Sequence, residues 1–214
     1  MNIPALLRLT GTLPFMLLLN TGVANARNDV QVNDLSPPIG QVDFPVSCSA
    51  AIRDRFERAV MMLHHMMYAQ SEKEFRSIAA TEPDCAMAHW GIAMTLFHPL
   101  WPGEPTEEEL QQGTMAVQKS KALNPPTDKE KAYILAAESY FADCRDKTHP
   151  ERIASWKESQ KSVYKGNPDE TDAAAFYALS LLATAPKEDK TYANQRKAGA
   201  ILEEIYSIEP EHPG

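Results

Sequence analysis

The chain has 214 residues, of which 43% are hydrophobic and 23% are charged, and its net charge at pH 7 is −8. That length is sufficient for one domain with a substantial core. The excess of acidic residues, without any long basic cluster, argues against nucleic acids and anionic membranes as partners. The composition excludes little else.

The N-terminus predicts a secretory signal peptide over residues 1–26. Arg8 is the only charged residue before Arg27, residues 13–19 are apolar, and Ala24-Asn25-Ala26 forms an A-x-A cleavage site. An uncleaved signal anchor would need a longer apolar run than this one. We therefore expect a mature chain of 188 residues (214 − 26) that is periplasmic or secreted and does not insert into a membrane after cleavage.

The remainder divides into a lead-in and a helical domain. Residues 27–47 are polar and punctuated by prolines, which predicts an extended segment. From residue 48 to residue 214 the apolar residues recur at helical spacing and no alternating run of β-branched residues occurs, so the predicted fold class is all-α. The expected helices span residues 49–70, 72–81, 85–98, 106–123, 127–144, 150–165, 170–184 and 191–208.

Four prolines mark a repeat along the helical part. Pro83, Pro125, Pro168 and Pro210 are separated by 42, 43 and 42 residues (125 − 83, 168 − 125 and 210 − 168). A constant period in this range is typical of a solenoid built from helix pairs.

The segment around Trp90 is predicted to lie at the centre of the core. Residues 85–98 are apolar on two sides of the expected helix, which is typical of a helix buried between neighbours. Trp90 is then the largest buried anchor. The small residue Gly91 would allow another helix to approach closely.

The three cysteines are Cys48, Cys85 and Cys144. In an exported protein the default is one disulfide and one odd thiol. Cys48 precedes the first expected helix and Cys85 begins the third, which places both towards the same end of the first hairpin. Cys48–Cys85 is therefore the preferred pair, and the alternative is three buried or free thiols.

The segments that end at the period prolines resemble the tetratricopeptide repeat (TPR). Its pattern is a small residue, an aromatic residue four positions later and a proline eight positions beyond that. With the aromatic residue relaxed to an aliphatic one, the pattern occurs at Ser71/Phe75/Pro83, Gly113/Val117/Pro125 and Ala198/Leu202/Pro210, whereas Trp156/Gln160/Pro168 departs from it.

Longer stretches are similar to a family of exported bacterial TPR-containing proteins, over most of the chain from residue 48. They are PDCAMAHWGIAM, NPDETDAAAFYALSLLATAP, DKTYANQRKAGAILE and PEHPG. The resemblance implies a right-handed α-solenoid of antiparallel helix hairpins. Members of that family continue beyond the His-Pro-Gly stretch, so this chain is either a short member or a fragment whose last repeat lacks its cap.

A TPR-like fold implies a scaffold that binds an unidentified protein or peptide in the groove of the solenoid. Met61, His65 and Tyr68 lie on the side of the first expected helix opposite its core stripe, so they are candidate groove residues. The alternative is that they pack under residues 43–46 of the lead-in.

A copper-type metal site is the alternative function. Imidazole, thiol and thioether ligands suit copper, especially Cu(I), in an exported protein. His64 and His65 point about 100° apart on a helix, so only one of them can face a shared site. The candidate ligands, on the first and third expected helices, are His64, His65, Cys85, Met87 and His89.

No catalytic motif stands out. A Gly-rich phosphate loop, a G-x-S-x-G elbow and an H-E-x-x-H pair are all missing from the sequence. We therefore expect no enzymatic activity and, outside the copper alternative, no cofactor.

Overall fold

The computed structural model describes residues 39–214, so the predicted signal peptide and residues 27–38 lie outside the described part. Residues 39–214 contain helices and no strand, which confirms the all-α prediction for this part of the chain. None of these helices is both long and apolar enough to cross a membrane. The elements are a 3₁₀ turn, η1 (Ala50–Ile52), followed by α1 (Arg53–His64), α2 (Tyr68–Thr81), α3 (Ala86–Met94), α4 (Glu107–Ala122), α5 (Asp128–Phe141), α6 (His149–Gly166), α7 (Thr171–Ala183) and α8 (Ala193–Ile208).

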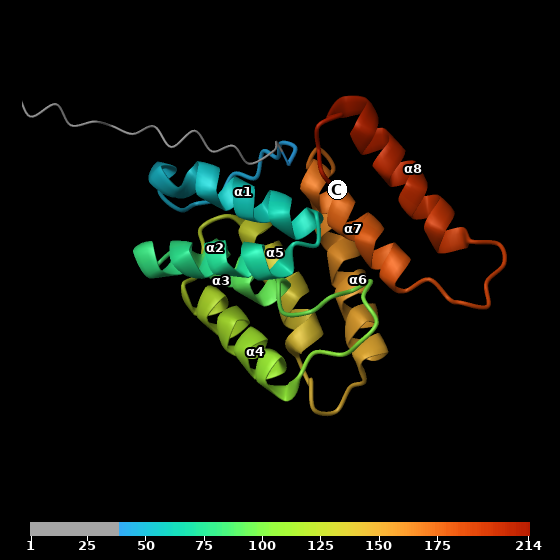
Figure 1. The fold of residues 1–214 in the computed structure, drawn as a ribbon, viewed down its shortest axis with the longest axis horizontal. Helices are drawn as coiled ribbons and strands as arrows, with labels where there is room; N and C mark the ends of the chain where they lie inside the picture. Colours follow the sequence, from blue (N-terminus) through green and yellow to red (C-terminus); the bar gives the residue numbers. More distant parts are fainter. Residues whose placement is uncertain (1–38) are drawn as a thin grey trace, which may run out of the picture. The chain divides into compact units, whose positions relative to one another are not determined.

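Each helix packs against the next one along the chain, from α1 against α2 to α7 against α8 (Figure 1). Helix α3 also contacts α1 and α5. This position explains why α3 is apolar on two sides, as the sequence predicts: of its nine residues, only His89 is not buried. The chain thus forms successive neighbouring helices with α3 enclosed among several of them.

Side-chain caps determine where three helices begin. The Thr106 hydroxyl accepts the backbone N–H of Glu109, and the Glu109 carboxylate accepts the backbone N–H of Thr106 in return. Thr127 accepts the N–H of Glu130 at the start of α5. Thr148 forms a second capping box and starts α6. Each cap satisfies backbone N–H groups that have no partner inside the helix.

The predicted first helix at 49–70 is wrong, because the chain turns after His64. Met66 adopts a left-handed conformation (φ 58°), the N–H of Met67 bonds the carbonyl of Met62, and α2 begins at Tyr68. This is a Schellman-type helix end, which usually carries a glycine or asparagine at the left-handed position. Because position 66 is a methionine, the sequence gives no sign that the helix ends here. The helix expected at 85–98 likewise ends early, at Met94.

Aromatic rings from distant segments meet around Trp90. Trp90 is 1% exposed, and its ring contacts those of Phe44, Phe75, Tyr133 and Phe176. These partners come from the lead-in and from helices α2, α5 and α7. Trp90 is therefore the central anchor of the core that connects both halves of the helical array.

The described end of the lead-in is extended, but it is packed onto the helices. Phe44 is buried in the core, and Ser47 donates its N–H and its hydroxyl to the buried carboxylate of Glu130. A disulfide joins Cys48 to Cys85, the pair preferred from the sequence, and Cys144 remains a free thiol. The lead-in is thereby fixed across α1, α3 and α5.

The four period prolines occupy equivalent places. They follow the last residues of α2, α4, α6 and α8 by two or three positions (83 − 81, 125 − 122, 168 − 166 and 210 − 208). Since proline cannot continue a helix, each one separates a helix from the next segment. The period seen in the sequence therefore corresponds to the ends of alternate helices.

Candidate functional site

The three predicted groove residues do not line one groove. Met61 is partly buried and packs against the core, whereas His65 Nε2 lies 2.8 Å from the carbonyl oxygen of Ile39. Tyr68 stacks on His98, with ring centroids 4.2 Å apart, and burial raises the pKa of Tyr68 to about 12. His65 is otherwise exposed, so the alternative interpretation, in which it packs under residues 43–46, does not hold for this residue either.

The predicted copper ligands have other partners. Cys85 is in the disulfide and offers no thiolate, and Met87 is fully buried in the core. His89 Nε2 lies 3.3 Å from the carbonyl oxygen of Pro83. The ligand set predicted from the first and third helices is therefore not assembled. Only His64 belongs to a group of side chains that could hold a metal ion.

That group consists of His64, Asp172 and His212, which come from three separate places in the chain. His64 is the last residue of α1, Asp172 lies in the first turn of α7, and His212 follows α8. The Schellman-type turn ends α1 at His64. The ring of Phe176 on α7 stacks on that of His64 and also meets Trp90 of α3, which places Asp172 beside the end of α1. After α8 the chain returns to the lead-in, where the N–H of Gln41 donates to the carbonyl of Glu211, and this return brings His212 beside the other two.

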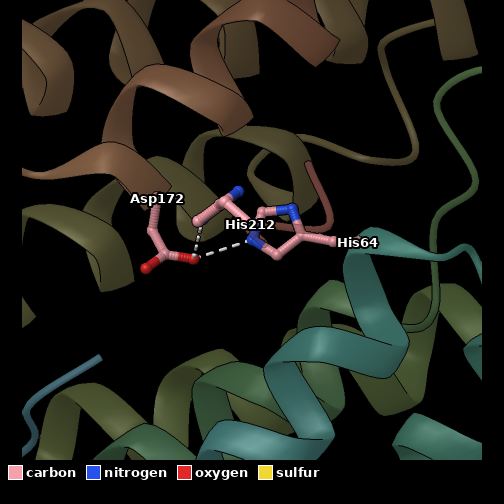
Figure 2. A group of neighbouring side chains, drawn as sticks. All are labelled: His64, Asp172 and His212. Carbon is pink, nitrogen blue, oxygen red and sulfur yellow. Dashed lines mark hydrogen bonds and ion pairs between the residues drawn. The ribbon is translucent and has the colours of Figure 1, made fainter. Parts of the chain in front are cut away.

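The geometry of this buried triad centres on one carboxylate oxygen. His64 Nε2 lies 2.7 Å and His212 Nε2 lies 3.5 Å from Asp172 Oδ1 (Figure 2). The ring of Phe176, one helical turn after Asp172, stacks on the His64 ring with centroids 4.5 Å apart. Phe176 thus holds the imidazole in the orientation that points Nε2 at the carboxylate.

Burial and charge determine the ionisation of the triad. Burial lowers the pKa of His64, although the carboxylate of Asp172 opposes this effect. For Asp172 burial alone would raise the pKa, but the contacts with His212 and His64 outweigh it, so the pKa lies below its ordinary value. The arrangement therefore favours a neutral His64 beside an ionised Asp172.

Sequence reasoning identified His64 and missed Asp172 and His212. Asp172 precedes the apolar run of α7, where a carboxylate reads as an ordinary residue of a helix N-terminus. His212 lies in the PEHPG stretch, which has no ligand spacing to His64. The sequence therefore carried no signal for Asp172 or His212, because the burial of the carboxylate is visible only in the structure.

A surface groove lies elsewhere, between α4 and the turn that connects α5 to α6. Its volume is about 750 Å³, and Met115 on its α4 side is 56% exposed. Leu110 and Phe141 add apolar surface to the lining. The other lining residues are Glu107, Gln111, Thr114, Gln118, Ala142, Asp143, Cys144, Arg145 and Asp146.

No family model, curated protein sequence or solved structure matches the chain.

Proposed function

We propose that this protein is an exported α-solenoid of TPR-like helix hairpins that binds a partner protein without catalysis. Three features support the solenoid: the packing of consecutive helices, the contacts of α3 with α1 and α5, and the place of the period prolines. Phe75, Val117 and Gln160, which occupy the same position of the repeat, are all buried, with exposed fractions of 0%, 2% and 1%. Repeat proteins of this kind use extended surfaces for binding.

The groove between α4 and the α5–α6 turn is the observation that carries the proposed binding site. It combines an exposed thioether at Met115 with the apolar edges of Leu110 and Phe141. Flexible methionine side chains adapt to a partner's apolar groups. In this proposal the exposed methionine beside the groove is the anchor point for one apolar side chain of the partner.

The charge around the groove indicates the chemistry of the partner. The lining contains three carboxylates, Glu107, Asp143 and Asp146, and one guanidinium, Arg145. Lys147 offsets the charge of Asp143, to which it pairs at 3.2 Å, so Glu107 and Asp146 remain against Arg145 in a chain whose net charge is −8. We propose that the occupant is a protein segment with an apolar side chain flanked by Lys or Arg residues, because its charge complements this surface.

Crosslinking from inside the groove tests this proposal. A photoreactive amino acid is placed at Met115 and, as a matched control, at Leu135, which is 52% exposed on α5 but does not line the groove. We expect one protein to be captured from position 115 and not from position 135. The purified partner should then bind the full chain with an affinity that falls as salt is added.

A charge in the groove provides the second arm of the test. Met115→Glu should weaken binding of that purified partner at least tenfold, whereas Leu135→Glu should leave it unchanged. Equal capture from both positions, or unchanged binding by Met115→Glu, would overturn the proposed site.

Export is the second part of the proposal. The disulfide between Cys48 and Cys85 supports it, because structural disulfides persist in oxidising compartments. Fractionation of cells that express the full chain, followed by mass measurement, tests it. The expected species begins at Arg27 and contains the disulfide, whereas an uncleaved, reduced chain in the cytoplasm would contradict export.

A further inference from the structure

Two polar atoms of the buried triad have no hydrogen-bond partner among residues 39–214: Asp172 Oδ2 and His212 Nε2. The side chains of His64, Asp172 and His212 are only 4%, 1% and 0% exposed. Buried polar atoms nearly always have partners, because an unpaired one loses its hydration without compensation. The triad therefore has binding capacity that the protein itself does not use.

We infer that His64, Asp172 and His212 form a binding site for a divalent transition metal ion of the zinc class. One ligand atom from each residue lies within 4.8 Å of the other two. Zinc binds imidazole nitrogen and carboxylate oxygen at about 2.0–2.2 Å, so tetrahedral ligand atoms lie about 3.3 Å apart. The 2.7 Å contact between His64 and Asp172 must then open by about 0.6 Å, which small side-chain rotations provide. The proton that His64 Nε2 donates to the carboxylate must also move to Nδ1 before this nitrogen can bind the metal ion.

The donor atoms determine the class of metal. Two imidazole nitrogens and a carboxylate suit Zn²⁺, Co²⁺ or Ni²⁺, whereas Cu(I) prefers thiolate and thioether ligands and Ca²⁺ or Mg²⁺ prefers oxygen alone. The unpartnered Oδ2 of Asp172 allows the carboxylate to bind through both oxygens. This site shares only His64 with the copper set expected from the sequence, and its donor atoms favour a different metal.

The hydrogen bond between Gly214 and His212 depends on which ring nitrogen of His212 carries the proton, so it should change when a metal ion binds. The backbone N–H of Gly214 donates to His212 Nδ1 at 3.1 Å, so the proton of the neutral ring is on Nε2. Coordination through Nε2 requires this proton to move to Nδ1, which then cannot accept from Gly214. Metal binding should therefore break this hydrogen bond.

Titration of the full chain with cobalt tests the site directly. After metal is removed with a chelator, Co²⁺ should bind at one equivalent and produce visible d–d bands, without the sulfur-to-metal absorption that a cysteine ligand would cause. One equivalent of Zn²⁺ should abolish the bands. The folded protein should also melt at a higher temperature with Zn²⁺, because metal bound only to the folded state stabilises it. A folded chain that binds no Co²⁺ or Zn²⁺ at one equivalent would overturn the inference.

Variants identify the ligands. Asp172→Asn and His212→Gln keep the approximate side-chain shape and should each weaken Zn²⁺ binding at least tenfold. His65→Gln is the matched control, because His65 neighbours His64 in sequence but contacts Ile39. The Zn²⁺ affinity of this variant should equal that of the wild-type protein. Wild-type affinity in folded Asp172→Asn and His212→Gln would refute the assignment, as would an equal loss in His65→Gln.

Nuclear magnetic resonance of the wild-type chain gives an answer even if a variant fails to fold. Zn²⁺ should shift the ring nitrogens of His64 and His212 and the amide of Gly214. Shifts confined to other histidines would rule out the triad as the site.

Discussion

The ring of Phe75 on α2 lies directly against the backbone of Gly91 on α3. A Cβ atom at position 91 would lie 2.4 Å from Phe75 Cδ1, well inside van der Waals contact. Phe75 is completely buried, and its ring also meets those of Phe56 and Trp90 edge to face. The ring therefore has little room to move, and only glycine allows the two helices to approach this closely.

Gly91→Ala should destabilise the protein, although alanine is the better helix former. We expect a loss of about 1–3 kcal/mol from overpacking, measured by urea unfolding. Gly199→Ala is the matched control, because Gly199 lies inside α8 and its Cβ would meet nothing within 4 Å. That variant should gain about 0.5–1 kcal/mol. Equal effects of the two substitutions would contradict the close contact.

Trp90→Ala should be among the most destabilising single substitutions. It removes the ring shared by the lead-in and three helices and leaves a cavity, so the expected loss is about 3–5 kcal/mol by the same measurement. Trp101→Ala serves as the control, because Trp101 is 55% exposed, and should change stability by less than about 0.5 kcal/mol. A small effect of Trp90→Ala would place that side chain outside the core.

Removal of the disulfide should loosen the attachment of the lead-in. The bond joins residues 37 positions apart, and the double variant Cys48→Ser/Cys85→Ser should lose about 2–4 kcal/mol relative to the oxidised protein. Cys144→Ser should have little effect, since Cys144 is a free thiol. Urea unfolding of the wild-type protein, measured with the disulfide intact and again after its reduction, checks this expectation. No difference between the two would show that the bond does not contribute.

The capping box of α4 should contribute stability that depends on pH. The backbone and side chain of Thr106 lower the pKa of Glu109 below its ordinary value, so this contribution is present above the ordinary pKa and is lost as the pH falls through the pKa of the folded state. Thr106→Ala should lose about 1 kcal/mol at neutral pH and less in acid. Thr81→Ala, at the end of α2 and outside any cap, is the control. A loss that stays constant with pH would show that Glu109 does not take part.

Local signals predicted most of the helices. The last three helices, expected at 150–165, 170–184 and 191–208, agree closely with α6, α7 and α8, because prolines and apolar periodicity delimit them. One exception is the helix expected at 85–98, which ends at Met94. The larger exception is the start of the domain, where Met66 adopts a left-handed conformation. That turn divides the expected first helix and positions His64.

The buried triad could not be predicted in the same way. His64 and Asp172 are 108 residues apart, and His212 lies beyond another helix. The interpretation of nearby His, Met and Cys residues as one ligand set assumed that closeness in sequence means closeness in space. The disulfide and the buried position of Met87 show that this assumption failed here.

The sequence by itself determined the helical class, the period of the prolines and the preferred cysteine pair, because apolar spacing, backbone restrictions and the order of the helices along the chain encode these features. The tertiary structure alone decided that Gly91 faces Phe75 and that His64, Asp172 and His212 converge. The physical reason is that such contacts depend on how whole helices pack against one another. The residues next to each of these positions in the chain do not specify how the helices pack.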